Sequence, residues 1–287
     1  MKHHKTTRAD SGFSYSRPFF EELVDSALRH ANKLGATDAA AEASEACGLS
    51  VSVRKGDLEN VERTRDKSLS VSAYVGLRRG NANTADFSDA ASAQTVKAAF
   101  DIARFTAEDP MAGLPDATDI APPSSLADEL ELFFPWQVTS EQAAELAKEC
   151  EQAALETDAR ITNSEGAAVS AQQSHFFSAH THGFRGGYSS SRHSISVSPI
   201  ASIGEDMQRD AWYSSMRDSK ELASAQRVGR YAAERALSRL GARKISTRQC
   251  PVLFESTLAS GLLGAFVQAV SGGALYRKSS FLLDSMG

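Results

Sequence analysis

The sequence predicts an α+β fold, with antiparallel sheets flanked by helices in two successive units and then the start of a C-terminal domain. The first observation is that strands follow one another along the chain instead of alternating with helices, which is typical of α+β proteins. The second is that the order helix, antiparallel strands, helix occurs twice, before and after a proline-rich linker. We interpret this as a coarse similarity of the two units and not as a demonstrated repeat.

The predicted boundaries follow from changes in composition and periodicity along the chain. The last segment stops directly after an apolar patch, and we therefore expect a chain that is truncated within its C-terminal domain. In order, we assign residues 1–17 to a disordered lead-in, 18–109 to an N-terminal domain, 110–135 to a linker, 136–245 to a middle domain and 246–287 to the beginning of a C-terminal domain.

In the first unit, a helix is predicted for residues 18–34, because apolar residues recur at helical spacing and Gly35 can end it. An antiparallel meander follows, in which apolar residues such as Leu49 and Val51 face one way and the serines between them the other. A second helix is expected at residues 90–106.

In the second unit, Thr139 and Gln142 have the spacing of a capping box, which predicts a helix that begins at Thr139 and runs to about residue 157. Four strands are predicted between residues 167 and 214, and a helix at residues 220–240 closes the unit.

The composition excludes several classes of protein. The hydrophobic fraction, 41%, is that of an ordinary globular protein. The net charge of -5 argues against nucleic acid, because phosphate binding needs a basic surface. No apolar run is long enough to span a bilayer. Cys47, Cys150 and Cys250 are far apart, which is typical of buried thiols in a reducing compartment. We therefore expect a cytoplasmic protein that binds neither nucleic acid nor membrane.

Several groups of residues could carry other chemistry, and we interpret each as structural. His180 and His182 would share a face of a strand and could begin a zinc site. Such a site would need further ligands, and the candidates show no characteristic spacing: they are His175, His193, Glu165 and the cysteines.

The glycines in Arg185-Gly186-Gly187 do not lead from a strand into a helix, as phosphate loops require, so they predict a tight turn between strands. A serine hydrolase would need a G-x-S-x-G elbow, which is absent around the three possible triad residues, Ser191, His193 and Asp206. A basic cluster straddles a helix end, where cations favour the helix dipole, although a partner subunit could also bind it; it comprises Arg235, Arg239, Arg243, Lys244 and Arg248.

Five segments, in order along the chain, resemble the TldD/PmbA metallopeptidase family, and within it the TldE/PmbA type of subunit. Five matches in the same order are much more specific than any one of them. The segments are K-G-D-L-E-N-V-E, A-A-F-D-I-A-R-F-T-x-x-D-P, D-A-R-I-T-N-S-E-G, S-R-H-S-I-S and Y-R-K-S-S-F-L-L-D-S.

The resemblance also locates a metal motif that this chain lacks. In TldD-type subunits, a helix carries the zinc-binding sequence H-E-x-x-x-H. Here that helix follows a predicted short strand, Pro251–Phe254, and is apolar enough to predict burial in a core. Its motif positions hold Gly264, Ala265 and Ala269, which offer no lone pair to a metal. The resemblance therefore implies no metal ligand and no catalytic residue on this chain, and it leaves the substrate-binding residues unknown.

The function that the resemblance implies is that of a subunit in a cytoplasmic, heterodimeric metallopeptidase that acts on unfolded or extended peptides. A TldD-type partner would hold the zinc, and this chain, without a cofactor of its own, would supply substrate binding and chamber walls. Two alternatives stay open. The chain could belong to an active metalloprotease whose ligands lie in the missing C-terminal part, or to a peptide-binding regulatory protein that hydrolyses nothing.

Overall fold

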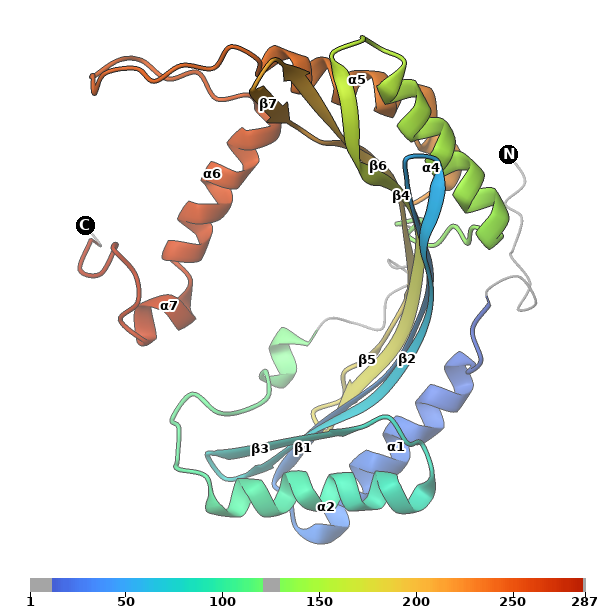
Figure 1. Ribbon diagram of the computed structural model, residues 1–287. Helices are drawn as coiled ribbons and strands as arrows, with labels where there is room; N and C mark the ends of the chain where they lie inside the picture. The colour runs from blue at the N-terminus through green and yellow to red at the C-terminus, as the bar shows by residue number, and fades with distance from the viewer. Residues whose placement is uncertain (1–11, 121–129, 286–287) are drawn as a thin grey trace. The chain divides into compact units, whose positions relative to one another are not determined.

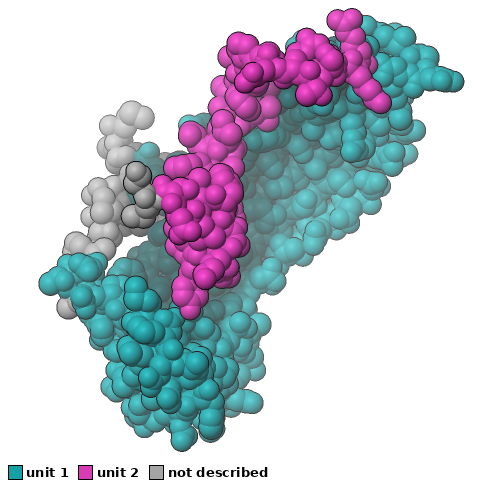
Figure 2. Space-filling view, turned by 90° about the vertical axis from the view of Figure 1, so that its left-hand side faces the viewer, with its two compact units in different colours: residues 1–241 teal, residues 242–287 magenta. Residues whose placement is uncertain are grey.

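The computed structural model describes residues 12–120 and 130–285 (Figure 1). Most of the predicted lead-in and part of the predicted linker lie outside these residues. The chain divides into two compact units, residues 1–241 and 242–287, which Figure 2 colours separately. Among the described residues, no helix is long and apolar enough to cross a membrane.

The first unit contains one eight-stranded antiparallel sheet, which confirms the predicted fold class. The strand order is β3-β2-β1-β4-β6-β7, with β5 paired to β4 and β8 paired to β6. The bounds are β1 Asp38–Arg54, β2 Asp57–Val75, β3 Arg78–Thr84, β4 Ile161–His180, β5 Arg185–Gly186, β6 Ser189–Ile203, β7 Asp206–Arg209 and β8 Trp212–Met216.

Strands from both predicted units share this sheet, because β1 pairs with β4 in antiparallel register. The pairing runs without interruption from Ala40 opposite His180 to Val53 opposite Ala167. Each predicted unit therefore contributes one set of strands to the sheet, and the two sets join where β1 pairs with β4, the first long strand of each.

Four helices cover one face of the sheet, and Figure 1 shows that this is the convex side of its curve. The ends of the first three agree closely with the sequence prediction: the Thr139–Gln142 capping box is present, and Gly35 ends the first helix with a φ of 94°. The fourth was predicted to begin at residue 220 but begins at Ala225, where Ser224 caps it. The bounds are α1 Arg17–Leu34, α2 Asp89–Phe105, α4 Ser140–Leu155 and α5 Ala225–Ser238, with short 3-10 turns η2 Ala117–Asp119 and η3 Ser219–Glu221.

Two apolar clusters lie between these helices and the sheet. The first cluster packs α1 and α2 on the sheet; its larger members are Phe20, Val24, Leu69, Val71 and Phe177. The second cluster packs α4 and α5 on the sheet; its larger members are Leu49, Val51, Val53, Val169 and Ile195. Both clusters draw on alternate residues of β1, so one strand contributes the same face to both.

The strands are longer than the apolar pattern predicts. The apolar alternation predicts separate strands at residues 60–64 and 69–73, but the structure has one continuous strand there, β2. Likewise, β4 replaces the strands predicted at residues 167–174 and 176–183. The reason is that the ladder of backbone hydrogen bonds continues through polar positions such as Glu45 and His175, where the alternation of apolar residues is broken.

In the second unit, the described helices are α6 Ser256–Ala269 and α7 Gly272–Tyr276. The prediction of a strand at Pro251–Phe254 is wrong: this segment has no regular secondary structure and pairs with no described strand. The predicted burial of α6 is also wrong for the described chain. Only Ala269 of that helix is buried, whereas Leu263 is 68% exposed.

The cysteines are all free, and only one fits the predicted burial. Cys150 lies inside the second cluster, and burial raises the pKa of its thiol to about 12. Cys47 is half-buried and Cys250 is exposed.

Candidate functional site

The concave face of the sheet is lined by hydroxyl groups. Because side chains alternate across a strand, the residues between the core positions all point to the face that α1, α2, α4 and α5 leave uncovered. Serine recurs at these positions on four neighbouring strands: Ser44, Ser50 and Ser52 of β1, Ser68, Ser70 and Ser72 of β2, Ser170, Ser174 and Ser178 of β4, and Ser190, Ser194 and Ser196 of β6. Serine is small enough for the crowded inner side of a curved sheet.

These hydroxyl groups are mostly half-buried and bond to one another across the strands. Ser174 and Ser190 lie 3.2 Å apart between their Oγ atoms, and Ser72 donates to Asn81 at 2.7 Å. A hydroxyl group can both donate and accept. The concave face can therefore bond to peptide N–H and C=O groups without selecting particular side chains.

Next to this face, the first part of β2 forms an open edge. Strand β3 pairs only with Leu69–Val75, and no other described strand lies on that side of residues 57–68. Exposed charged side chains such as Glu62 and Arg63 line this edge, which protects it against indiscriminate pairing. An open edge can still accept the backbone of an extended peptide.

The sequence predicted this surface only in part. Its signal is serine at every second position, as in Ser68-Leu69-Ser70-Val71-Ser72. This pattern indicates that one face of the strand is polar, but not that the polar faces of four strands lie side by side. The open edge could not be inferred from the sequence, because it depends on how far β3 extends along β2.

The residues that the family resemblance aligns with the zinc motif lie on α6, and their side chains carry no metal donor. Gly264, Ala265 and Ala269 are all within this helix, and a Cβ added at Gly264 would meet no atom within 4 Å. Over the described residues, no three His, Cys, Asp or Glu side chains are grouped closely enough to hold a metal ion. The residues present at the motif positions therefore do not fit zinc.

His180 and His182 do not share a strand face, because β4 ends at His180 and His182 lies in the turn beyond it. The Nε2 atom of His182 lies 2.9 Å from a carboxylate oxygen of Asp38, and its Nδ1 lies 2.8 Å from the carbonyl oxygen of Pro115. That carbonyl, assisted by Asp38, raises the pKa of His182. Both ring nitrogens thus tie the turn to neighbouring segments.

Ser191, His193 and Asp206 do not form a triad. The Ser191 hydroxyl donates to the carbonyl oxygen of Arg217 at 2.9 Å, and His193 Nε2 lies 2.8 Å from the carbonyl oxygen of Phe134. Asp206 instead accepts from the backbone N–H of Gly241. Ser191 also accepts from the backbone N–H of Phe134, so Ser191 and His193 fix the same linker segment, whereas Asp206 fixes the backbone at Gly241.

The glycine segment lies between β4 and β6, but the prediction of a tight turn at these residues is wrong: the turn is formed by residues 181–183. Arg185–Gly186 is β5, which pairs with Ser178 and Ala179 of β4. A Cβ at Gly187 would lie 2.1 Å from the carbonyl oxygen of Phe176, so the close approach of two backbones requires glycine there.

The basic cluster is split by the structure. Arg235 and Arg239 share Asp210 at 3.4 and 2.9 Å, and Arg235 also lies over the Trp212 ring. The other three cations, Arg243, Lys244 and Arg248, belong to the second unit. Arg235 and Arg239 therefore hold the end of α5 against Asp210 and β8.

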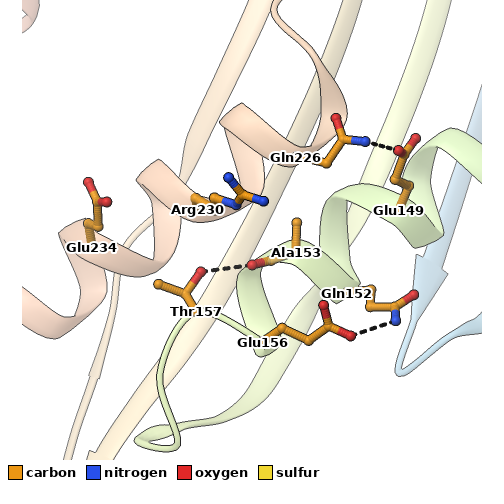
Figure 3. Close-up of a pocket in the computed structure, with 8 residues that line it drawn as sticks. All are labelled: Glu149, Gln152, Ala153, Glu156, Thr157, Gln226, Arg230 and Glu234. Carbon is orange, nitrogen blue, oxygen red and sulfur yellow. Dashed lines mark hydrogen bonds between the residues drawn. The ribbon is translucent and has the colours of Figure 1, made fainter.

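The outer surface of α4 and α5 holds a shallow polar pocket of about 420 Å³. Figure 3 shows Gln226 of α5 bonded to Glu149 of α4, while Gln152 donates to Glu156 at 2.7 Å. The glutamates face solvent, and their partners are neighbours on the same two helices. This pocket is accounted for by helix pairing, and we assign it no ligand.

The first unit is an α+β fold in which four helices cover one face of a curved antiparallel sheet and one edge of β2 has no partner strand among the described residues. Sequence profiles described as PmbA/TldA metallopeptidase domain 1, central domain and C-terminal domain match residues 39–103, 134–240 and 247–287. This chain belongs to the PmbA/TldD metallopeptidase family.

Named relatives support this assignment. The chain is 44% identical over 272 residues to the metalloprotease PmbA of Escherichia coli O157:H7, covering 94% of this chain and 59% of that protein. It is 40% identical over 266 residues to the PmbA homologue of Haemophilus influenzae, covering 93% and 58%. The chain thus spans less than two thirds of the length of these relatives.

Solved structures show the same fold. A putative modulator of DNA gyrase from Bacteroides thetaiotaomicron superposes with a TM-score of 0.81 at 25% identity, covering 93% of this chain and 60% of that one. TldE from Thermococcus kodakarensis superposes with a TM-score of 0.67 at 14% identity, covering 92% and 59%.

Proposed function

We propose that this chain is the non-catalytic subunit of a cytoplasmic TldD/TldE-type metallopeptidase complex that acts on unfolded or extended peptides. The partner subunit holds the zinc, and this chain supplies substrate binding and part of the chamber wall. The observation that carries the proposal is the combination of family membership with Gly264, Ala265 and Ala269 at the motif positions. A subunit without metal donors contributes to peptide hydrolysis through binding.

The concave face supports this role because its chemistry suits a backbone and not a particular side chain. An extended peptide presents N–H and C=O groups in turn, and the serine hydroxyls of β1, β2, β4 and β6 can bond to both. The open edge of β2 adds a row of backbone groups for strand addition.

The test is peptide hydrolysis by this chain, by a TldD-type partner with an intact H-E-x-x-x-H, and by their mixture. We expect chelator-sensitive hydrolysis of an unfolded polypeptide to be strongest in the mixture and absent from this chain alone. Chelator-sensitive hydrolysis by this chain alone would favour an active metalloprotease with its own ligands. No stimulation of the partner would favour a regulatory peptide-binding protein.

Substrate binding at the open edge can be separated from chemistry. Replacing Asn60 of β2 by arginine places a long charged side chain at the edge and should weaken the complex's apparent affinity for peptide more than it slows turnover. Gln152→Arg, on the outer surface of α4, is the matched control. Equal effects of the two substitutions would argue against binding at this edge.

A further inference from the structure

A band of polar residues crosses the otherwise apolar, helix-covered face of the sheet. The register aligns Lys67, Glu45, His175 and Ser189 in one cross-strand row, and Arg65, Cys47, Gln173 and Ser191 in the next. We call these eight residues the polar belt. It separates the first apolar cluster from the second, so the two helix layers pack on opposite sides of it.

The segment of residues 12–16, just before α1, lies across the polar belt, and we call it the strap. The prediction of a disordered lead-in is therefore wrong for these residues. The backbone N–H groups of Ser14 and Tyr15 donate to the carboxylate of Glu45 at 2.9 to 3.0 Å. Arg65 donates to the Gly12 carbonyl oxygen at 2.9 Å and to the Ser14 hydroxyl at 2.6 Å.

Glu45 is the centre of this attachment. Its side chain is completely buried, and a buried carboxylate remains charged only when donors surround it. Burial alone would raise the pKa of Glu45, but the N–H groups of Ser14 and Tyr15, together with His175 and Arg65, outweigh burial and lower it. The strap thus provides two of the groups that keep this carboxylate ionised.

The strap also contacts the linker. The ring of Phe13 stacks on the ring of His175, with centroids 4.1 Å apart. It also stacks on the ring of Phe133 in the linker, with centroids 5.6 Å apart. The linker in turn is bound to the sheet, because the Phe134 N–H donates to the Ser191 hydroxyl at 2.9 Å. A chain of direct contacts therefore runs from Glu45 through the strap to the linker.

We propose that the polar belt is a clasp, in which the Glu45 carboxylate holds the strap and Phe13 of the strap holds Phe133 and Phe134 at the end of the linker. Opening the strap then loosens these two residues as well.

Both apolar clusters are packed mainly by their own helices. The first cluster also contacts the clasp, through Tyr15 of the strap and through Phe20, whose ring stacks on His175 at 4.6 Å. The clasp is thus a local element that opens while the rest of the unit stays folded.

Hydrogen exchange of the full chain, followed by mass spectrometry, tests this coupling. In Glu45→Gln, the amide NH₂ faces N–H donors and cannot replace a carboxylate oxygen. We expect exchange of the strap amides and of the Phe134 amide to rise about tenfold, while β1 near Val51 keeps its protection. Glu42→Gln, on the same strand but facing the concave side, is the control and should change neither.

Ser14→Pro provides a second variant if Glu45→Gln does not fold, because it removes one donor of the strap and leaves the sheet intact. Faster exchange of the strap and of Phe134 together in this variant supports the clasp. Strap amides that stay as protected as in the unaltered chain, or a strap that opens while Phe134 is unaffected, would overturn it.

Discussion

The guanidinium group of Arg65 lies 2.5 Å from the carboxylate of Glu45, although the register of β1 and β2 pairs Arg65 with Cys47. The contact is therefore diagonal, between neighbouring rows on the same face of the sheet. Glu45 is fully buried and Arg65 is about half exposed. This ion pair, with one buried member, lies between two clusters of apolar side chains on the same face of the sheet.

Replacing Arg65 by methionine should leave the Glu45 carboxylate short of a donor. We expect the free energy of unfolding to fall by about 1–3 kcal/mol, because a buried charge is left incompletely compensated. Arg17→Met removes an exposed pair with Glu21 and should cost less than about 0.5 kcal/mol. Urea unfolding of both variants measures the difference, and equal losses would contradict the buried role of Glu45.

The stability of the first unit should fall in mild acid because of His175. Burial lowers its pKa below the ordinary 6.5, against the opposing effect of Glu45, 3.4 Å away. The other charged groups of the belt, Arg65 and Lys67, lie beyond Glu45 on β2.

The folded state thus favours neutral His175. The contribution of this residue to the free energy of unfolding is complete above pH 6.5 and is lost as the pH falls below that value. Unfolding free energies measured from about pH 8 to about pH 5 should decline, and His175→Gln should flatten the decline. An unchanged slope in that variant would assign the effect to another group.

Gly229 marks the closest approach of α5 to α4. A Cβ there would lie 2.2 Å from the carbonyl oxygen of Cys150, which is backbone and cannot move aside. Gly229→Ala should therefore push the helices apart and destabilise the unit by about 1–3 kcal/mol. Gly264→Ala, where nothing lies within 4 Å, should stabilise α6 slightly, as alanine usually does in a helix. Thermal unfolding and circular dichroism compare the two, and a neutral Gly229→Ala would refute the close packing.

Restoring the motif residues should not create a zinc peptidase. The triple variant Gly264→His, Ala265→Glu, Ala269→His supplies the donors, but residues five apart on a regular helix lie about 140° from each other. We expect no stoichiometric zinc in the unaltered chain by elemental analysis and no chelator-sensitive hydrolysis by the variant. One tightly held zinc per unaltered chain would contradict the first expectation, and hydrolysis by the variant the second.

Much of the local structure could be predicted because its signals are local. The capping box at Thr139 and the glycine at position 35 set helix ends through hydrogen bonds within a few residues. Likewise, the alternation around Leu49 and Val51 indicates which side chains enter a core, and both are buried.

The polar belt could not be predicted, because its members are far apart in the chain. His175 and Glu45 are 130 positions apart, and neither belongs to a recognisable motif. Glu45 interrupts an apolar alternation, which suggests the end of a strand, yet the strand continues through it. What compensates its charge is the strap, a segment that precedes the first helix and that composition alone assigns to disorder.

Short-range patterns in the sequence were enough to predict the four helices of the first unit, α6, the facing of the strand residues and the family, whereas α7 was not predicted. The assembled sheet alone decided that β1 and β4 pair, that β2 has an open edge and that Pro251–Phe254 is not a strand. The physical reason is that caps and periodicity are satisfied within a few residues, whereas a strand exists only where a distant segment offers its backbone groups.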